Sequence, residues 1–210
     1  GYDCSADSSL DPCHMSAYDA ETGRRLWRWY TSPTPEDPMH YTWGDDPQVY
    51  PLEIRENMSP WMTPAIDTER GLVIFGIGSS APQQPELAGT DGEWPDRLYQ
   101  GSTVALDYRT GELVWWAQHH TDMWNNDSVF DRMLVDSPVA PDPPGALGVN
   151  PDITPGEERQ LVVGSFSKDG IFYAYDRSDG TFLYARPTGY QNVIQSYDGR
   201  TGAYTTSPDA

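Results

Sequence analysis

Hydrophobic and polar positions along the chain form a repeated unit. In residues 17–27, 105–115 and 174–184, an alternating stretch reaches an Asp, a Gly follows four positions later, and a second stretch ends on an aromatic residue. A shorter copy covers residues 196–202 and a degenerate copy covers 64–75. Each copy predicts a strand, a tight turn and a second strand, because the Asp can bond the turn amides and Gly supplies the positive φ of a bulged three-residue hairpin loop.

The aromatic residue at the end of each copy gives the hairpins a way to associate. It is Trp27 in the first copy, Trp115 in the second and Tyr184 in the third. We expect each of these rings to pack against the neighbouring hairpin, so that every unit needs another one to bury its face. The repeat therefore predicts an all-β fold, a β-propeller fragment of about four to five blades arranged as an open arc.

The segments between the copies predict loops rather than a second domain. Residues 33–60 and 80–97 are long, polar and rich in proline, and residues 137–158 combine Pro, Gly and Asp without periodicity. We expect the last of these to be a long excursion between strands. Residues 1–210 are thus interpreted as one partial propeller domain.

Charge excludes two classes of partner. Thirteen basic and thirty-two acidic residues give a formal charge of −19, which repels both nucleic acid and anionic membrane surfaces. The sequence also lacks a run of eighteen apolar residues, so it predicts no membrane span. Because the chain starts at Gly1 without a Met or an apolar leader, we expect a fragment or a processed product.

Cysteine and histidine add few constraints. Cys4 and Cys13 are nine positions apart, and a disulfide or two free thiols are both open alternatives. The motif Cys-x-x-Cys-His does not occur, so this segment attaches no c-type haem. His119 and His120 are adjacent, and neighbours in an extended strand face opposite sides. We therefore expect one exposed and one half-buried histidine rather than a shared metal site.

The repeat resembles the tryptophan-docking motif of the eight-bladed quinoprotein alcohol dehydrogenases, which use pyrroloquinoline quinone (PQQ). Residues 76–82 are similar to that family's Gly-x-Gly-Asn-x-x-Pro. Residues 118–127 are similar to its Gln-x-x-x-x-Asp-x-Trp-Asp-x-Asp, with one position fewer between the Gln and the first Asp. Residues 167–177 are similar to its Lys-Asn-Gly-x-x-x-x-Leu-Asp-Arg. The resemblance runs over nearly the whole chain.

The resemblance implies a cofactor site near the propeller axis, with Ca²⁺ or a lanthanide ion beside PQQ. Trp61 stands at the position of the tryptophan floor, and Lys168 at that of the cation which bonds the quinone oxygens. An ordinary core Trp and a surface Lys are the alternatives. We expect Trp61, Ser79, Asn125, Asp127 and Lys168 to converge on the inner, axis-facing side of the sheets.

Two departures from the family pattern concern the metal and the base. Ser79 replaces a metal-binding Asn, and Asn125 replaces the carboxylate usually assigned as base, although an amide cannot take a proton at neutral pH. Asp127 stands where lanthanide-dependent relatives carry an extra carboxylate, so it is the candidate metal ligand and base. The Trp-Asn sequence at residues 124–125 also resembles the polyvinyl alcohol dehydrogenase branch of the family. The family's metal-binding Glu falls near Ser8, where the alignment gives no definite match.

Two functions follow from these observations. The first is a periplasmic PQQ-dependent dehydrogenase that oxidises an alcohol, polyol or aldose, with a cytochrome c as candidate electron acceptor. The second is a non-catalytic propeller that serves as a protein-binding scaffold, since a fold does not fix a function. Trp61 and Lys168 favour the first function, whereas Ser79 and Asn125 favour the second.

Overall fold

The elements of the chain are almost all β-strands. The computed structural model describes residues 13–43, 58–79, 96–120, 127–141 and 143–208. The strands are accompanied by two short 3-10 helices, η1 (Pro38–Trp43) and η3 (Pro143–Gly145). In this described part of the chain, none of the helices has the length and apolar character needed to cross a membrane.

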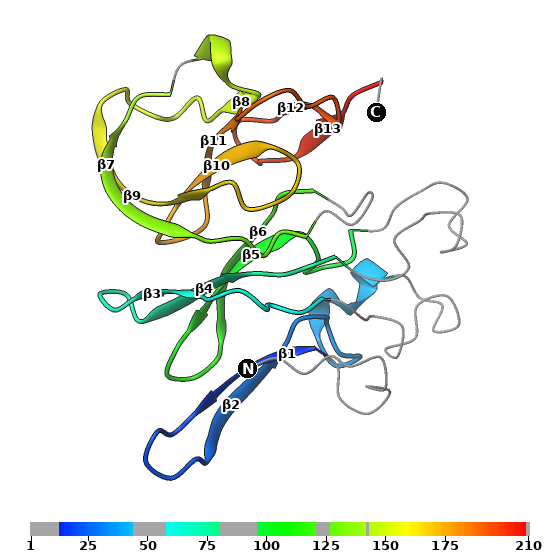
Figure 1. The fold of residues 1–210 in the computed structure, drawn as a ribbon, viewed down its shortest axis with the longest axis vertical. Helices are drawn as coiled ribbons and strands as arrows, with labels where there is room; N and C mark the ends of the chain where they lie inside the picture. The colour runs from blue at the N-terminus through cyan, green and yellow to red at the C-terminus, as the bar shows by residue number, and fades with distance from the viewer. Residues whose placement is uncertain (1–12, 44–57, 80–95, 121–126, 142, 209–210) are drawn as a thin grey trace.

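The strands form four antiparallel sheets in series (Figure 1). The first is a hairpin of β1 (His14–Tyr18) and β2 (Arg25–Tyr30). The second contains, in order, β3 (Ala65–Asp67), β4 (Leu72–Gly76), β5 (Ser102–Asp107) and β6 (Leu113–Gln118). The third has the order β7 (Met133–Val139), β9 (Glu157–Gly164), β10 (Ile171–Asp176), β11 (Phe182–Pro187) and β8 (Gly148–Val149). The fourth pairs β12 (Ile194–Tyr197) with β13 (Tyr204–Thr206). The expected all-β architecture of several sheets is confirmed.

The predicted turn chemistry is present in the hairpins. Asp107 Oδ1 accepts hydrogen bonds from the backbone N–H groups of Arg109 at 2.7 Å and Thr110 at 3.2 Å. Gly111 follows with φ of 77°, and a register shift after Ala105 marks the expected bulge. The Asp of each remaining copy also accepts at least one turn amide; these are Asp19, Asp67, Asp176 and Asp198. The Asp-to-Gly spacing therefore specifies the turn.

Two tryptophans join neighbouring sheets as predicted. The indole N–H of Trp27 donates to the Tyr108 carbonyl at 2.9 Å, and that of Trp115 donates to the Arg177 carbonyl at 3.1 Å. Each acceptor directly follows the Asp of the next turn. A Cβ atom built on Gly180 would lie 2.6 Å from the Trp115 ring, so glycine permits the close approach.

The third copy docks differently from the expectation. Tyr184 occupies the aromatic position, but the residue that meets Gly202 of the following hairpin is Phe182. Tyr184 instead stacks on Phe172, with ring centroids 6.4 Å apart. Phe182 belongs to the buried cluster that reaches Tyr197 of the fourth sheet, whereas Tyr184 packs against a separate cluster with Leu183.

Residues 137–158 contain more regular structure than the sequence predicts. The segment holds the end of β7, the helix η3, the two-residue strand β8 and the start of β9. Pro138 lies in β7, which is the edge strand of the third sheet as the described strands form it and pairs there with β9. An edge tolerates a proline because its missing N–H faces away from the ladder.

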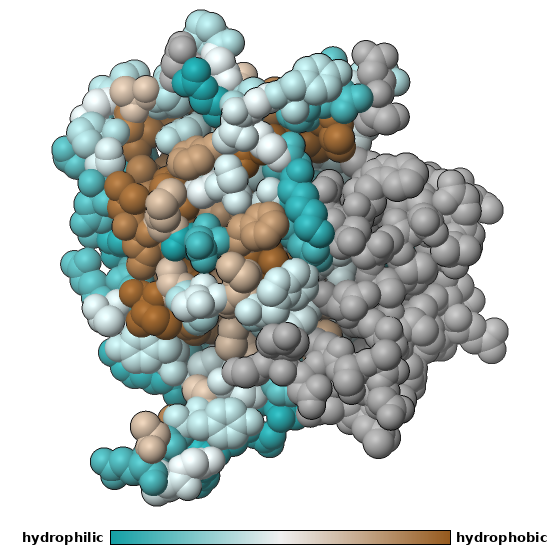
Figure 2. Space-filling model, viewed as in Figure 1, coloured by the Kyte–Doolittle hydropathy of each residue, from teal (hydrophilic) through white to brown (hydrophobic). Residues whose placement is uncertain are grey.

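Hydrophobic packing continues from sheet to sheet. One buried cluster includes Ile74 and Trp115 from the second sheet, Val162 and Tyr173 from the third, and Ile194 from the fourth. Figure 2 shows hydrophobic side chains gathered on one face over the two large sheets. The sheets are thus stabilised mainly by burial against each other, as repeat units require.

A buried ion pair also joins the second and third sheets. Arg177 Nε lies 3.1 Å from Asp67 Oδ2, and Asp67 is 4% exposed. Burial by itself would raise the pKa of Asp67, but hydrogen bonds from Arg70 and the charges of Arg177 and Arg70 outweigh it and hold this pKa below its ordinary value. Asp67 is therefore a charged residue held between cations.

Cys13 is disulfide-bonded and buried, so the disulfide is the alternative that the structure supports. Cys4 lies outside the described residues.

Candidate functional site

Three connections between strands begin at the end of the sheets that lies opposite the Asp-to-Gly turns. β4 and β6 both pair antiparallel with β5, so they run in the same direction and their last residues lie at the same end of the sheet. In the third sheet, β9 likewise ends opposite the β10–β11 turn. The connections after these three strands carry Ser79, Asp127 and Lys168, respectively.

These three predicted site residues meet. Ser79 donates to Asp127 Oδ1 twice, from its hydroxyl at 3.1 Å and from its backbone N–H at 3.4 Å. Lys168 Nζ lies 2.5 Å from Asp127 Oδ2. The Asp127 side chain is 10% exposed and the Lys168 side chain 45% exposed, so a shielded carboxylate is paired with an ammonium that reaches solvent. Three of the five residues expected to converge are therefore in contact, and their position on the axis-facing side of the sheets stays a prediction.

Two glycines at strand ends bring the backbone of residues 127–132 close to the sheets. A Cβ atom on Gly76, at the end of β4, would lie 1.9 Å from the Ser128 carbonyl oxygen. A Cβ atom on Gly164, at the end of β9, would lie 2.7 Å from the Asp131 carbonyl oxygen. Any side chain at either position would push this segment, and with it Asp127, away from its partners.

A buried polar network lies behind the three residues. Arg132 donates to Thr103 Oγ1 from Nε at 3.2 Å and from Nη2 at 3.0 Å, and Thr103 Oγ1 also lies 2.9 Å from His119 Nε2. Because the guanidinium occupies the acceptor sites of the hydroxyl, Thr103 must donate its proton to His119. His119 is then the neutral tautomer with a proton on Nδ1, which it donates to the Tyr175 hydroxyl at 2.8 Å.

Burial governs the protonation of this network. Complete burial, followed by the charges of Arg132 and His120, holds the pKa of His119 well below 6.5. Burial also lowers the pKa of the Arg132 guanidinium to about 9. The low pKa of His119 agrees with the neutral tautomer that the hydrogen bonds require.

Both adjacent histidines are buried, so the expectation of one exposed and one half-buried side chain is wrong. His119 is 0% exposed and His120 is 2% exposed. They do face different groups, since His119 contacts Thr103 and His120 contacts Ser167. Protein therefore covers both faces of the chain at these two residues, directly after β6.

Of the other two predicted site residues, Trp61 lies among the described residues. Trp61 is 38% exposed and lines a cavity of about 430 Å³. Its fellow lining residues include Met15, Trp27 and Tyr108, whereas Ser79, Asp127 and Lys168 do not line this cavity. A shared site for Trp61 stays a prediction. Asn125, together with Ser8 and its neighbours, lies outside the described residues.

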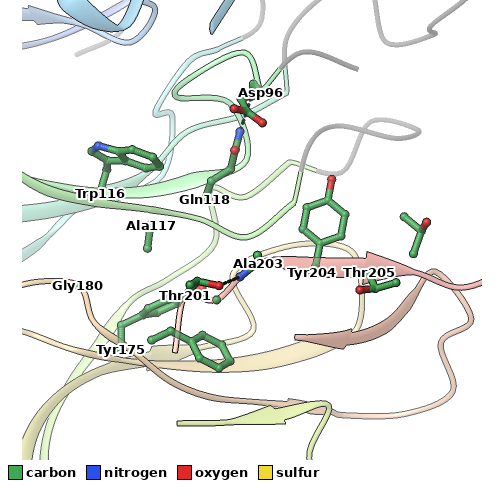
Figure 3. Close-up of a pocket in the computed structure, with 13 residues that line it drawn as sticks. Asp96, Trp116, Ala117, Gln118, Tyr175, Gly180, Thr201, Ala203, Tyr204 and Thr205 are labelled. Carbon is green, nitrogen blue, oxygen red and sulfur yellow. Dashed lines mark hydrogen bonds between the residues drawn. The ribbon is translucent and has the colours of Figure 1, made fainter. Parts of the chain in front are cut away.

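A second cavity of about 710 Å³ opens between β6, the β10–β11 turn and β13 (Figure 3). Trp116 and Gln118 line it from β6, and Tyr204 lines it from β13. Gln118 is fixed by donating to the Asp96 carbonyl at 2.6 Å. Among the described site residues, Trp61, Ser79, Asp127 and Lys168 do not line this cavity. Tyr175, the partner of His119, does.

The described residues fit an anionic cofactor better than they fit a metal ion. Among residues 13–43, 58–79, 96–120, 127–141 and 143–208, no group of three or more His, Cys, Asp or Glu side chains is placed to hold a metal ion. Asp127 offers one carboxylate, and Lys168 already opposes its charge. Because a hard cation prefers several oxygen ligands, Asp127 and Ser79 by themselves are too few to hold one. The Lys168 side chain, in contrast, is 45% exposed, so an anionic group can reach its ammonium from solvent.

Sequence reasoning missed the residues that support the cluster. Ser128 and Ser167 are buried neighbours of Asp127 and Lys168, and nothing in a serine predicts burial. The adjacent histidines were the signal that could have revealed these serines. Buried polar side chains need hydrogen-bond partners, so two buried histidines next to the Asp127 segment imply buried polar partners close by.

Comparison with known proteins agrees with the geometry. The profile of the family described as PQQ, glucose/ethanol/alcohol dehydrogenase, β-propeller domain, matches residues 4–196. The dehydrogenase subunit of the quinone alcohol dehydrogenase of Gluconobacter oxydans (strain 621H) is 31% identical over 208 residues. That alignment covers 93% of this chain and 25% of the relative, so the chain spans about a quarter of its length.

Solved structures show the same similarity. The crystal structure of quinohemoprotein alcohol dehydrogenase from Comamonas testosteroni superposes with a TM-score of 0.76 at 27% identity, over 94% of this chain and 28% of that one. A europium-containing methanol dehydrogenase gives a TM-score of 0.70 at 20% identity over 94% of this chain and 33% of that one, which shows the shared fold alone. The chain belongs to the family of PQQ-dependent glucose/ethanol/alcohol dehydrogenase β-propeller domains.

Proposed function

We propose that this chain is part of a PQQ-dependent dehydrogenase that oxidises an alcohol, polyol or aldose, in which Asp127 is the proton acceptor and Lys168 contacts the cofactor. The observation that carries the proposal is the convergence of Ser79, Asp127 and Lys168 from three separate connections. Such a group of a shielded carboxylate, a hydroxyl and an exposed ammonium is suited to handling a proton and an anion together.

Asp127, Ser79 and Lys168 have separate roles in the proposed reaction. Bound PQQ supplies a hydride acceptor for the carbon of the alcohol. Asp127 accepts the proton of the alcohol hydroxyl, and Ser79 fixes the carboxylate by donating to Oδ1. Protonation removes the negative charge of Asp127, so the charge of Lys168 becomes available to stabilise a negative group beside it. Proton transfer and anion stabilisation are thereby coupled through one ion pair.

We further propose a Ca²⁺ or lanthanide ion that uses Asp127 as its charged ligand, with Ser79 and Asn125 as neutral ligands. Asp127 and Ser79 would supply part of the ligand set of this ion, which would polarise the oxygen of the alcohol as a Lewis acid. Trp61 is proposed as the platform for the flat quinone, which its 38% exposure supports. A periplasmic location and a haem protein such as a cytochrome c as electron acceptor complete the proposal; similarity to a quinohemoprotein supports the acceptor.

The test is alcohol-dependent dye reduction by the full-length protein, reconstituted with PQQ and either Ca²⁺ or a lanthanide. Asp127→Ala removes the proton acceptor, and we expect kcat to fall by a factor of about 10²–10⁴. Asp152→Ala is the matched control, because Asp152 also pairs with a cation, Arg200, but on the exposed surface. Equal activity of Asp127→Ala and Asp152→Ala would refute the role of Asp127.

A scaffold function is the second candidate. The partial metal shell among the described residues favours it, because a non-catalytic propeller has no need of a complete one. If the full-length wild-type protein binds no PQQ, the scaffold function replaces the dehydrogenase.

A further inference from the structure

His120 lies between the two segments that carry the proposed catalytic ion pair. We call residues 127–132, which precede β7, the Asp127 loop, and residues 165–170, between β9 and β10, the Lys168 loop. His120 Nε2 is 2.9 Å from Ser167 Oγ in the Lys168 loop and 3.4 Å from Ser128 Oγ in the Asp127 loop. It also lies 3.6 Å from Asp169 Oδ2, again in the Lys168 loop.

Each serine is the direct chain neighbour of a site residue. Ser128 follows Asp127, and Ser167 precedes Lys168. Both hydroxyl-bearing residues are buried, at 0% and 5% exposure. An unprotonated Nε2 accepts from the serine hydroxyls, and a protonated Nε2 donates to one of them; in either state one ring nitrogen is shared between the two loops.

Other contacts also join the same two loops, at residues that are not next to Asp127 or Lys168 in both loops. The Phe130 backbone N–H donates to the Phe166 carbonyl at 3.2 Å, and the Arg132 guanidinium lies 4.6 Å from the centre of the Phe166 ring. Arg132 also holds the Asp127 loop directly, by donating to the Ser128 carbonyl at 2.6 Å. These contacts join the two loops to each other through Phe130, Arg132 and Phe166, whereas His120 touches the residues next to Asp127 and Lys168 themselves.

We propose that His120 is a positioning residue that sets the distance between Asp127 and Lys168 by holding Ser128 and Ser167 together. This inference rests on the proposed function for its catalytic consequence, but the contact between the loops can be measured by itself. Loss of the shared nitrogen lets the two loops separate, and a separation of about 1 Å between catalytic groups costs about 10²-fold in rate.

His119 provides a matched control. It is the preceding residue, it is equally buried, and its ring also makes two hydrogen bonds, but to Thr103 and Tyr175 instead of the two loops. His119→Phe and His120→Phe therefore remove similar polar contacts from similar environments. His120→Gln restores a polar atom near the position of Nε2 and serves as the conservative variant.

Steady-state kinetics of the full-length, PQQ-loaded protein give the first readout. We expect His120→Phe to lower kcat by a factor of about 10–100 with little change in KM for the alcohol, and His120→Gln to recover most of it. Ser167→Ala should lower kcat more than Ser128→Ala, because its contact with Nε2 is shorter. If His120→Phe has the same kcat as His119→Phe at equal melting temperature, the positioning role is wrong.

Hydrogen exchange measured by mass spectrometry on the protein without cofactor gives the second readout. In His120→Phe, peptides that cover 127–132 and 165–170 should both exchange at least several-fold faster than in the wild type, whereas His119→Phe should not accelerate both. Unchanged exchange in both peptides of His120→Phe overturns the inference. Faster exchange in a protein whose wild type oxidises no alcohol supports the contact while refuting the dehydrogenase, so the two failures are distinguishable.

Discussion

Trp115 and Gly180 lie in neighbouring sheets and are in contact: a Cβ atom on Gly180 would stand 2.6 Å from ring carbon Cε3 of Trp115. The indole N–H simultaneously donates to the Arg177 carbonyl, three residues before Gly180. One side chain therefore makes two contacts with the next turn: its ring packs against the glycine, and its N–H binds a backbone carbonyl. The glycine is needed twice, for its φ of 73° and for the space that the ring occupies.

This double requirement predicts a large effect of Gly180→Ala. The positive φ costs about 1–2 kcal/mol with an alanine, and the clash with the ring adds about 1–3 kcal/mol. Gly156→Ala is the control, since Gly156 has φ of 87° but nothing within 4 Å of its added Cβ. Urea unfolding of the full-length protein should show the larger loss of free energy for Gly180→Ala. Equal losses would mean that the Trp115 contact does not stabilise the fold.

Gly76→Ala should disturb the site rather than the turn chemistry. Its Cβ would lie 1.9 Å from the Ser128 carbonyl oxygen, so the segment that carries Asp127 must move. We expect a loss of about 1–3 kcal/mol in the free energy of unfolding, with a fall in alcohol oxidation. Gly189→Ala, which has nothing within 4 Å of the added Cβ, should leave both quantities unchanged. Full activity of Gly76→Ala would show that Asp127 need not stay at its observed distance from Ser79.

His119 should make the protein sensitive to acid. Its pKa in the folded state is held well below 6.5 by burial, then by Arg132 and His120, so below pH 6.5 the unfolded chain binds a proton that the folded chain does not. Stability therefore falls as pH decreases below this value, by up to about 1.4 kcal/mol per pH unit. Urea unfolding between pH 4.5 and 7.5 should give a shallower dependence for His119→Phe. Parallel curves for the wild type and the variant would contradict the buried neutral histidine.

The repeat predicted most of the fold because its signals are local. The four-residue spacing from Asp107 to Gly111 fixes a turn by itself, and the aromatic at Trp115 predicts a neighbour. Tyr184 was expected to dock on the next hairpin, but Phe182 meets Gly202 there and Tyr184 packs against the cluster of Leu183. The local pattern cannot reveal this exchange, because it depends on which face of the third sheet lies against the fourth.

The candidate site was predictable from family resemblance and not from spacing. Asp127 lies 48 residues after Ser79 and 41 before Lys168, so their contacts depend on how the sheets stack. The burial of His120 was missed for the same reason, since the enclosing loops come from two sheets.

The most direct test of the account is the affinity of the full-length protein for PQQ, measured by fluorescence titration in the wild type, Lys168→Met and Arg200→Met. Lys168 is proposed to contact the cofactor, whereas Arg200 forms an exposed ion pair with Asp152 and serves as the control. Loss of hydrogen bonds from a charged group costs about 1.5–3 kcal/mol, so Lys168→Met should raise Kd by a factor of about 10–100. Arg200→Met should match the wild type. An unchanged Kd for Lys168→Met would contradict the proposed cofactor site.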